Sequence, residues 1–478
     1  MMNPPASTIA RAAVRVLAVW TAASLSGCMV GPDYVRPGTD VPAAYKELPP
    51  NKPAEPRDTA PRGNWWEVFG DPELNALEAQ VAQANQTLKQ AEANYRVAHA
   101  AIRVAQAGLY PGVTGSAAAT RAGGGGNSRS ATGNLYTASL DASWELDLWG
   151  RIRRGVEASE ATAQASAADV ANTQLSLEAE LAQDYLLLRV ADAEKRVLEA
   201  TVTAYTDNYN LTQNRYKAGV AARADVVQAE AQLLAAKVQL IDLNVSRANF
   251  EHAIAVLIGK PPSELSILPK EGTPMLPEIP VGVPSELLER RPDIASAERQ
   301  MAAANANIGV ATAAIYPSRT LSATGGFVGT SFANWISLPN RFWSIGATLA
   351  GTVFDAGAKF ALRDEAIAQY DANVAGYRQT VLSAFQDVED NLSTLRILDQ
   401  EAGVQDQALR AARESVVLTT NQYKAGIVAY LNVVTVQAVA LQSELNQVQL
   451  RGRRFSASIA LVKALGGGFD ATSLAATR

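Results

Sequence analysis

The sequence predicts an α+β membrane protein in which a few membrane-spanning strands continue into long helices. Three observations carry this prediction. Segment 136–148 alternates apolar and polar residues over a longer stretch than a globular strand usually covers. Residues 156–218 contain neither Gly nor Pro, and the second half of the chain repeats the first. Together they predict an antiparallel β-barrel that several chains share, continuous with a helical coiled-coil barrel.

Composition excludes several classes of function. The 478 residues carry a formal charge of −5 without basic runs, so no nucleic-acid partner is expected. One cysteine and two histidines form no metal-spaced or triad-like pattern, so we expect no cofactor and no enzyme activity. No long apolar run follows the N-terminus. If the protein lies in a membrane, it must therefore do so as a barrel.

The N-terminus reads as a secretory signal followed by a lipid anchor. Residues 1–27 combine Arg11 and Arg15 with a short apolar stretch. Leu25-Ser26-Gly27-Cys28 then matches the bacterial lipobox, which predicts that Cys28 is acylated and anchors the chain in the outer membrane. The alternative is an ordinary free thiol. The Pro-rich stretch up to residue 62 predicts an extended, lipidated N-terminal segment over 28–62.

Segment 136–148 has one apolar and one polar face, because side chains of a strand alternate. Leu140, Trp144 and Leu146 are expected to face lipid. Asp141 and Glu145 are expected to line water, as is Asp147, less surely because it lies where the strand meets the next helix. The alternative interpretation of this segment alone is a long half-buried strand of a soluble sheet.

An internal repeat organises the rest of the chain. Tyr216-Lys217-Ala218-Gly219 recurs as Tyr423-Lys424-Ala425-Gly426, an offset of 207 that holds without a gap as far as Gly259 and Gly466. The predicted parts are copy one at 63–260, a Pro-rich linker at 261–284, copy two at 285–466 and a tail at 467–478.

Each copy has the same predicted layout of one helix, two strands and a pair of long helices. Copy one begins with a helix over 73–107 after Asp71-Pro72, which are favourable residues for a helix start. The strands are expected at about 113–120 and 136–148 in copy one, and at about 319–328 and 341–353 in copy two. The turns at 216–219 and 423–426 then reverse the chain, with Gly219 and Gly426 as helix C-caps.

These elements predict a conduit. Four strands per chain cannot close a membrane barrel, since the smallest have about eight, so two, three or more chains must share one. A helix of about 60 residues is about 90 Å long, so the helices are expected to form a second cylinder below the strands. The turns at 216–219 and 423–426 would lie together at its far end.

The motifs, in this order, resemble those of the TolC-like outer-membrane efflux channels, specifically the lipoprotein branch that serves RND-type multidrug pumps (NodT-type). The resemblance covers Cys28 to about Gly466. It rests on the lipobox, Gly31-Pro32-Asp33-Tyr34, Arg36-Pro37, Trp65-Trp66, Phe69, Asp71-Pro72, Arg290-Arg291-Pro292-Asp293-Ile294, Glu298, Ile308-Gly309, Tyr316-Pro317 and the paired turns.

The resemblance implies a homotrimer with a 12-stranded barrel and a periplasmic helical tunnel. It also implies a periplasmic adaptor, an inner-membrane RND pump, and a passive exit for drugs or other small toxic compounds. Helix-turn tips bind the adaptor in that family, so the expected contact residues are Tyr216, Lys217, Gly219, Tyr423, Lys424 and Gly426.

Asp225 lies about where the family places acidic residues that close the tunnel. Its alternative role is a solvated carboxylate paired with Arg223. In copy two, Asn432 and Thr435 depart from the family pattern, so no acidic gate is expected there. Two other functions stay open: the outer-membrane duct of a type I protein secretion system, and a coiled-coil envelope scaffold without a pore.

Overall fold

The computed structural model describes residues 29–47, 64–123, 133–270, 272, 274–277, 279, 284 and 290–469. The predicted signal peptide, the lipidation site Cys28 and the predicted tail after Phe469 lie outside these residues. Within the described part, no helix is long and apolar enough to cross a membrane.

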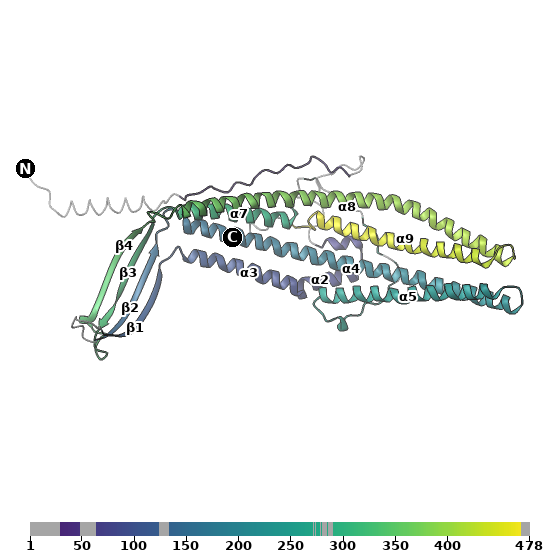
Figure 1. Cartoon of the computed structure of the whole chain (residues 1–478), viewed down its shortest axis with the longest axis horizontal. Coiled ribbons are helices and arrows are strands. Elements are labelled where there is room, and N and C mark those ends of the chain that lie inside the picture. The colour runs from purple at the N-terminus through teal and green to yellow at the C-terminus, as the bar shows by residue number, and fades with distance from the viewer. Residues whose placement is uncertain are drawn as a thin grey trace, which may run out of the picture. The chain divides into compact units, whose positions relative to one another are not determined.

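Long helices and one small sheet make up the described chain (Figure 1). The elements are, in order, η1 Trp65–Phe69, α2 Pro72–Ala84, α3 Gln86–Ala107, β1 Gly112–Ala122, β2 Gly133–Glu145, α4 Arg151–Lys217, α5 Arg223–Leu257, η2 Pro262–Glu264, α7 Pro292–Ala313, β3 Ser318–Gly329, η4 Leu338–Asn340, β4 Arg341–Ala350, α8 Ala358–Lys424 and α9 Tyr430–Ala464.

The chain divides into two compact units. Unit 1 comprises 1–38, 94–167 and 296–378, and contains the sheet. Unit 2 comprises 39–93, 168–295 and 379–478, and contains α5, α9 and the larger, C-terminal parts of α4 and α8, with both hairpin turns.

The sheet of unit 1 is antiparallel throughout, in the order β1-β2-β3-β4. Two predicted strands were too long at their C-terminal ends: β2 ends at Glu145 instead of 148, and β4 ends at Ala350 instead of 353. The carboxylate of Asp147 accepts the backbone N–H groups of Ile152 and Arg153 at 3.0 and 2.9 Å. It thereby satisfies two N–H groups of the first turn of α4, which a helix leaves unpaired. Asp147 therefore starts the helix and does not belong to the strand.

The predicted single helix over 73–107 is two helices, because Asn85 interrupts it with an extended backbone (φ −61°, ψ 128°). The Asn85 side chain accepts the N–H of Leu88 at 3.0 Å and donates to the carbonyl of Leu257 at 2.8 Å. An asparagine in this position caps the next helix. The interruption between α2 and α3 is therefore stabilised by the hydrogen bond from Asn85 to α5 of the same unit.

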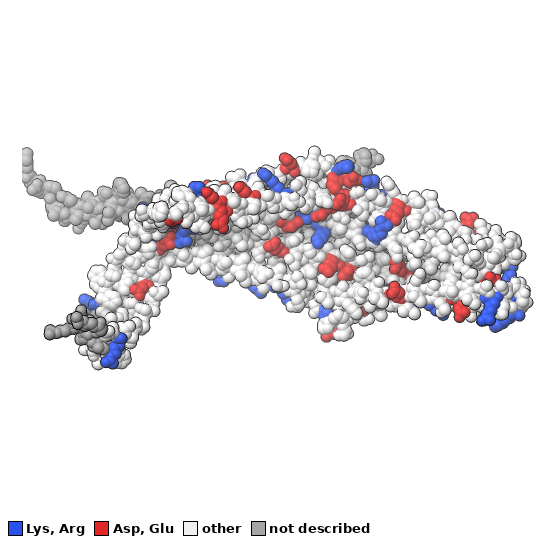
Figure 2. All heavy atoms as spheres, viewed as in Figure 1, with Lys and Arg blue, Asp and Glu red and all other residues white. Residues whose placement is uncertain are grey.

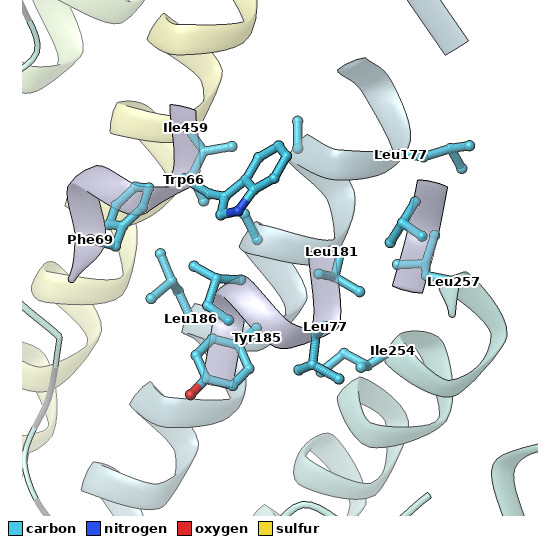
Figure 3. Close-up of a cluster of buried hydrophobic side chains, with 14 of the residues drawn as sticks. Trp66, Phe69, Leu77, Leu177, Leu181, Tyr185, Leu186, Ile254, Leu257 and Ile459 are labelled. Carbon is cyan, nitrogen blue, oxygen red and sulfur yellow. The ribbon is translucent and has the colours of Figure 1, made fainter. Parts of the chain in front are cut away.

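Unit 2 is built on a buried core in which η1 and α2 pack against α4, α5 and α9 (Figure 3). Trp66, Leu77 and Tyr185 are among its members. Burial of one such apolar side chain contributes about 1.5–3 kcal/mol. Asp71 caps α2 by accepting the N–H of Glu73 at 3.0 Å, and it also accepts the Tyr185 hydroxyl at 2.9 Å. The cap and the core thus fix α2 together.

Candidate functional site

The sheet has one polar face, formed by residues that the strand register places in rows. Thr114, Asp141, Thr324 and Ser344 are paired in sequence across all four strands. The Asp141 carboxylate accepts hydrogen bonds from the Thr324 hydroxyl at 2.7 Å and the Ser139 hydroxyl at 2.8 Å. A fixed carboxylate in a row of hydroxyls is a surface suited to water and cations.

The opposite face is apolar and uncovered within the described chain. Gly115, Leu140, Gly325 and Trp343 form the neighbouring row. Leu140 is 63% exposed, Trp343 75% and Ile345 78%. Exposed apolar side chains on one face of a sheet indicate contact with lipid or with another protein.

Two side chains near the C-terminal end of β2 have partners within the chain that the sequence did not predict. Glu145 pairs with Arg151 at 2.7 Å, so its charge is matched within the chain and it contributes less free charge than Asp141. The Trp144 indole, expected to face lipid, donates its N–H to the carbonyl of Leu109 at 2.9 Å.

Both edges of the sheet are open among the described residues. β1 and β4 each pair with only one neighbouring strand, and no further strand joins them. An unpaired strand edge leaves backbone N–H and C=O groups without partners, which is forbidden in lipid and favours pairing with another chain.

The two hairpin turns of unit 2 have the same backbone geometry. Gly219 and Gly426 have φ values of 72° and 76°, a left-handed conformation that suits glycine. In the first turn, the N–H of Val220 donates to the carbonyl of Arg215 at 2.8 Å. In the second, Ile427 donates to Gln422 at 2.9 Å. These bonds close the ends of α4 and α8 as C-caps.

The two tyrosines of the repeated turn differ in burial. Tyr216 is 44% exposed, whereas Tyr423 is 5% exposed and belongs to an apolar cluster with Tyr430 and Val433. Tyr423 therefore packs inside the cluster at the hairpin turns. Its ring has almost no exposed surface for a partner, contrary to the predicted adaptor contact. Lys217 and Lys424 are exposed, and lysine and arginine side chains gather at the end of the α4–α5 hairpin (Figure 2).

Asp225 lies in the first turn of α5 and is partly exposed. Among the described residues it forms no ion pair with Arg223, and its partial exposure is compatible with the alternative role of a solvated helix-face carboxylate. Burial, and to a lesser degree the charges around it including that of Asp225, raises the pKa of Tyr430 to about 12. Asn432 and Thr435, in α9, are exposed and uncharged.

Sequence reasoning missed the contacts that hold the N-terminal segment in unit 1. Arg154, 2% exposed, pairs with Asp33 and with Glu157, both at 2.7 Å. The Tyr34 hydroxyl donates to Glu298, and burial together with this bond raises the pKa of Tyr34. These contacts could have been suspected from the sequence, since Asp33, Tyr34 and Glu298 belong to the motifs that carry the family resemblance.

Comparison with known proteins gives consistent matches. A model of the family described as outer membrane efflux protein matches residues 77–260 and 283–467. The chain is 32% identical over 456 residues to the antibiotic efflux pump outer membrane protein ArpC of Pseudomonas putida, covering 94% of each chain. It is 31% identical to the pyoverdine export outer membrane protein OpmQ of Pseudomonas aeruginosa, covering 93% of this chain and 95% of that one. The solved structure of the outer-membrane channel OprN matches with a TM-score of 0.84 and 33% identity, over 92% of this chain and 99% of that one.

Proposed function

Because this chain belongs to the outer membrane efflux protein family, we propose that three copies of it form the exit duct of a tripartite pump. The protein is an outer-membrane efflux channel with the α+β fold of that family. The trimer, the partners and the residues that act in transport are the parts that we add.

The proposal rests on the sheet, which has one polar face, one apolar face and an unpaired strand at each edge. Three copies of four strands supply 12, which is enough to close a membrane barrel, whereas four are not. Pairing of β4 in one copy with β1 in the next removes every open edge. In such a barrel the row containing Leu140 faces lipid, and the row containing Asp141 lines the pore, with Glu145 nearer its end.

The internal repeat supplies the second half of the duct in the same proposal. α4 and α8 each have 67 residues, α5 and α9 each have 35, and α3 and α7 each have 22. Equal lengths support two copies of one unit, so that each chain contributes matching hairpins to a helical tunnel.

The partners follow from the tripartite arrangement: a periplasmic adaptor and an inner-membrane RND pump. We assign adaptor contact to Tyr216, Lys217 and Lys424, which are exposed at the turns formed by Gly219 and Gly426. Tyr423 is withdrawn from this set because it is buried. Since ArpC is named for antibiotics and OpmQ for pyoverdine, the cargo class is small organic compounds, which pass without catalysis and without a cofactor.

We also assign Cys28 as the lipid anchor. The support is its place at the end of the lipobox Leu25-Ser26-Gly27-Cys28, directly after the predicted signal. Cys28→Ser should abolish incorporation of labelled fatty acid, and unchanged labelling would refute the anchor.

Single-channel recording in planar bilayers tests the duct. Purified protein that migrates as a trimer should give discrete conductance steps, and removal of the helix tips by limited proteolysis should enlarge them. A well-folded trimer that conducts neither before nor after tip removal would overturn the proposal.

A further inference from the structure

A groove of about 410 Å³ lies in the apolar face of the sheet, within unit 1. Its floor is the interior strand β3, where Ala323 and Gly325 are successive residues on this face. The strand register places Leu140 of β2 and Trp343 of β4 on either side of Gly325, and Ile345 of β4 beside Ala323. Large side chains on the neighbouring strands therefore form walls along a floor of small residues.

Gly325 is a glycine that neither the backbone nor the packing of the chain requires. Its φ is not positive, and a Cβ added to it would meet no atom within 4 Å. The next residue, Gly326, differs, because a Cβ there would meet the carbonyl oxygen of Ala138 and, at 2.8 Å, the Cα of Ser139. A glycine inside a strand costs conformational entropy and often marks a place where a ligand approaches closely. The open space above Gly325 is therefore a candidate binding site.

The surroundings of the groove limit what can occupy it. Leu140, Trp343 and Ile345 are exposed, so no described part of the chain covers them. β3 lies between β2 and β4 (Figure 1), whereas a second copy in the proposed barrel pairs at the edges, with β1 and β4. The second copy then lies beside the sheet and not over β3. Since the protein is an outer-membrane channel, the surrounding lipid is what meets this face.

The width of the groove suits a single hydrocarbon chain. Its walls are on β2 and β4, and neighbouring strands lie about 4.8 Å apart, so the missing side chain on β3 leaves a gap about as wide as one strand. Non-bonded carbon atoms attract one another best at about 3.5–4.0 Å. Because lipid tails are as apolar as this face, van der Waals contact decides where a tail rests. A tail in the groove contacts the floor and both walls, whereas a tail on a flat surface has contacts on one side.

Arg341 supplies a positive charge beyond one end of the groove. It lies two positions before Trp343 in β4 and therefore on the same face. β4 begins at Arg341, at the end of the sheet remote from α7 and α8. The side chain is exposed, and among the described residues no carboxylate forms an ion pair with it. An arginine fork binds phosphate oxygens, and its long stem lets the charge reach lipid headgroups from the apolar region.

We propose that the groove over Gly325 holds one acyl chain of a membrane lipid whose phosphate headgroup binds Arg341. Each copy of the chain then carries one such lipid on the outer surface of the barrel. The inference rests on the proposed orientation of the sheet, with its apolar face toward lipid, and adds a specific ligand to that face.

Native mass spectrometry of the detergent-purified trimer tests the binding. The probe is dimyristoyl phosphatidylglycerol, and dimyristoylglycerol provides the same acyl chains without the phosphate. We expect one probe molecule to bind per copy of the chain. Gly325→Leu fills the open space and should weaken the binding constant about tenfold, which corresponds to about 1.4 kcal/mol; Gly325→Ala should weaken it less. Arg341→Gln should weaken binding of the phosphatidylglycerol to the level of the dimyristoylglycerol.

Ala347→Leu is the matched control. Ala347 lies on the same face, in β4, and is exposed, but it does not line the groove. Its replacement adds the same apolar bulk and should leave the binding constant unchanged. The spectrum also gives the mass of the trimer, so a Gly325→Leu variant that fails to assemble is recognised, and Gly325→Ala then decides. Equal binding constants for the Gly325 variants and Ala347→Leu would overturn the groove, and equal binding of the two lipids would overturn the contact with Arg341.

Fluorescence quenching of Trp343 separates this inference from the duct proposal. Lipids brominated in their acyl chains quench a tryptophan that they contact. The difference between the unchanged protein and Trp343→Phe in liposomes gives the quenching of this residue alone, and we expect it to be strong. Quenching of Trp343 without any effect of Gly325→Leu on lipid binding would overturn the groove and leave the sheet orientation standing. Absence of quenching would overturn the orientation, and the groove with it.

Discussion

The guanidinium carbon of Arg215 lies 4.8 Å from the centroid of the Tyr423 ring, and the Tyr430 ring meets that ring edge-on at 5.2 Å. Arg215 lies in the last turn of α4, whereas Tyr423 and Tyr430 belong to α8 and α9. The contact therefore joins the two hairpins at their turns.

Tyr423→Leu should loosen the turns, because it removes a cation–π contact of about 0.5–2 kcal/mol and an aromatic pair of about 0.5–1.5 kcal/mol. We expect trypsin to cut after Lys217 and Lys424 about tenfold faster. Tyr423→Phe is the control, since the Tyr423 hydroxyl is buried and has no hydrogen-bond partner among the described residues. Equal cleavage rates in the Leu and Phe variants would show that the ring contacts do not hold the tip.

Asp225→Ala should raise single-channel conductance and weaken cation preference. In the proposed trimer three copies of this carboxylate face one another, and a ring of negative charge attracts cations. Reversal potentials in a KCl gradient measure the effect. Glu230→Ala removes an exposed carboxylate from the same helix and should change neither quantity. If both variants behave like the unchanged protein, Asp225 is not the gate.

Glu78 gives unit 2 a predicted dependence on pH. It is 1% exposed, both carboxylate oxygens lack partners among the described residues, and burial raises its pKa to about 10, with Glu178 adding to the shift. The unfolded value is about 4.3. The neutral carboxyl therefore favours the folded state fully below about pH 4.3, and this contribution is lost as the pH rises toward 10.

Glu78→Gln should accordingly increase the free energy of unfolding at pH 8, by about 1–3 kcal/mol, and have less effect at pH 5. Denaturant unfolding of the purified protein at both pH values provides the comparison. Glu230→Gln replaces an exposed carboxylate of α5, also in unit 2, and should leave the pH dependence as it is. A larger gain at pH 5 than at pH 8 would contradict the assignment.

Gly309→Ala should detach the N-terminal segment of unit 1. A methyl group there would lie 2.8 Å from Cγ of Arg154, the residue that holds Asp33. Overpacking of this kind costs about 1–3 kcal/mol. Faster proteolysis of residues 29–38 is the expected readout. Gly155→Ala, whose added methyl meets nothing within 4 Å, is the control; equal proteolysis of both variants would remove Gly309 from this role.

The sequence predicted the helices and strands because their signals are local. Alternation identified β2, and the absence of Gly and Pro identified α4. One error occurred where a tertiary contact decides, and the other at a local helix cap. Asn85 breaks a favourable helix because it also reaches Leu257 of α5, and Asp147 leaves the strand because it caps α4.

The candidate site was predictable only in part for the same reason. Alternation placed Asp141 on the polar face, but no pattern along β2 reveals that Glu145 pairs with Arg151. Tyr216 and Tyr423 occur in the same four-residue motif, yet only Tyr423 is covered by the other hairpin. A motif defines the turn, whereas burial depends on which elements meet there.

Cysteine accessibility in the conducting channel tests the central claim, that the polar face of the sheet lines the pore. Asp141→Cys and Leu140→Cys differ by one position and lie on opposite faces. A charged, membrane-impermeant thiol reagent should lower the conductance of the Asp141→Cys channel and leave the Leu140→Cys channel unchanged, with the protein lacking either change as the baseline. Block through Leu140→Cys, with Asp141→Cys unaffected, would contradict the account.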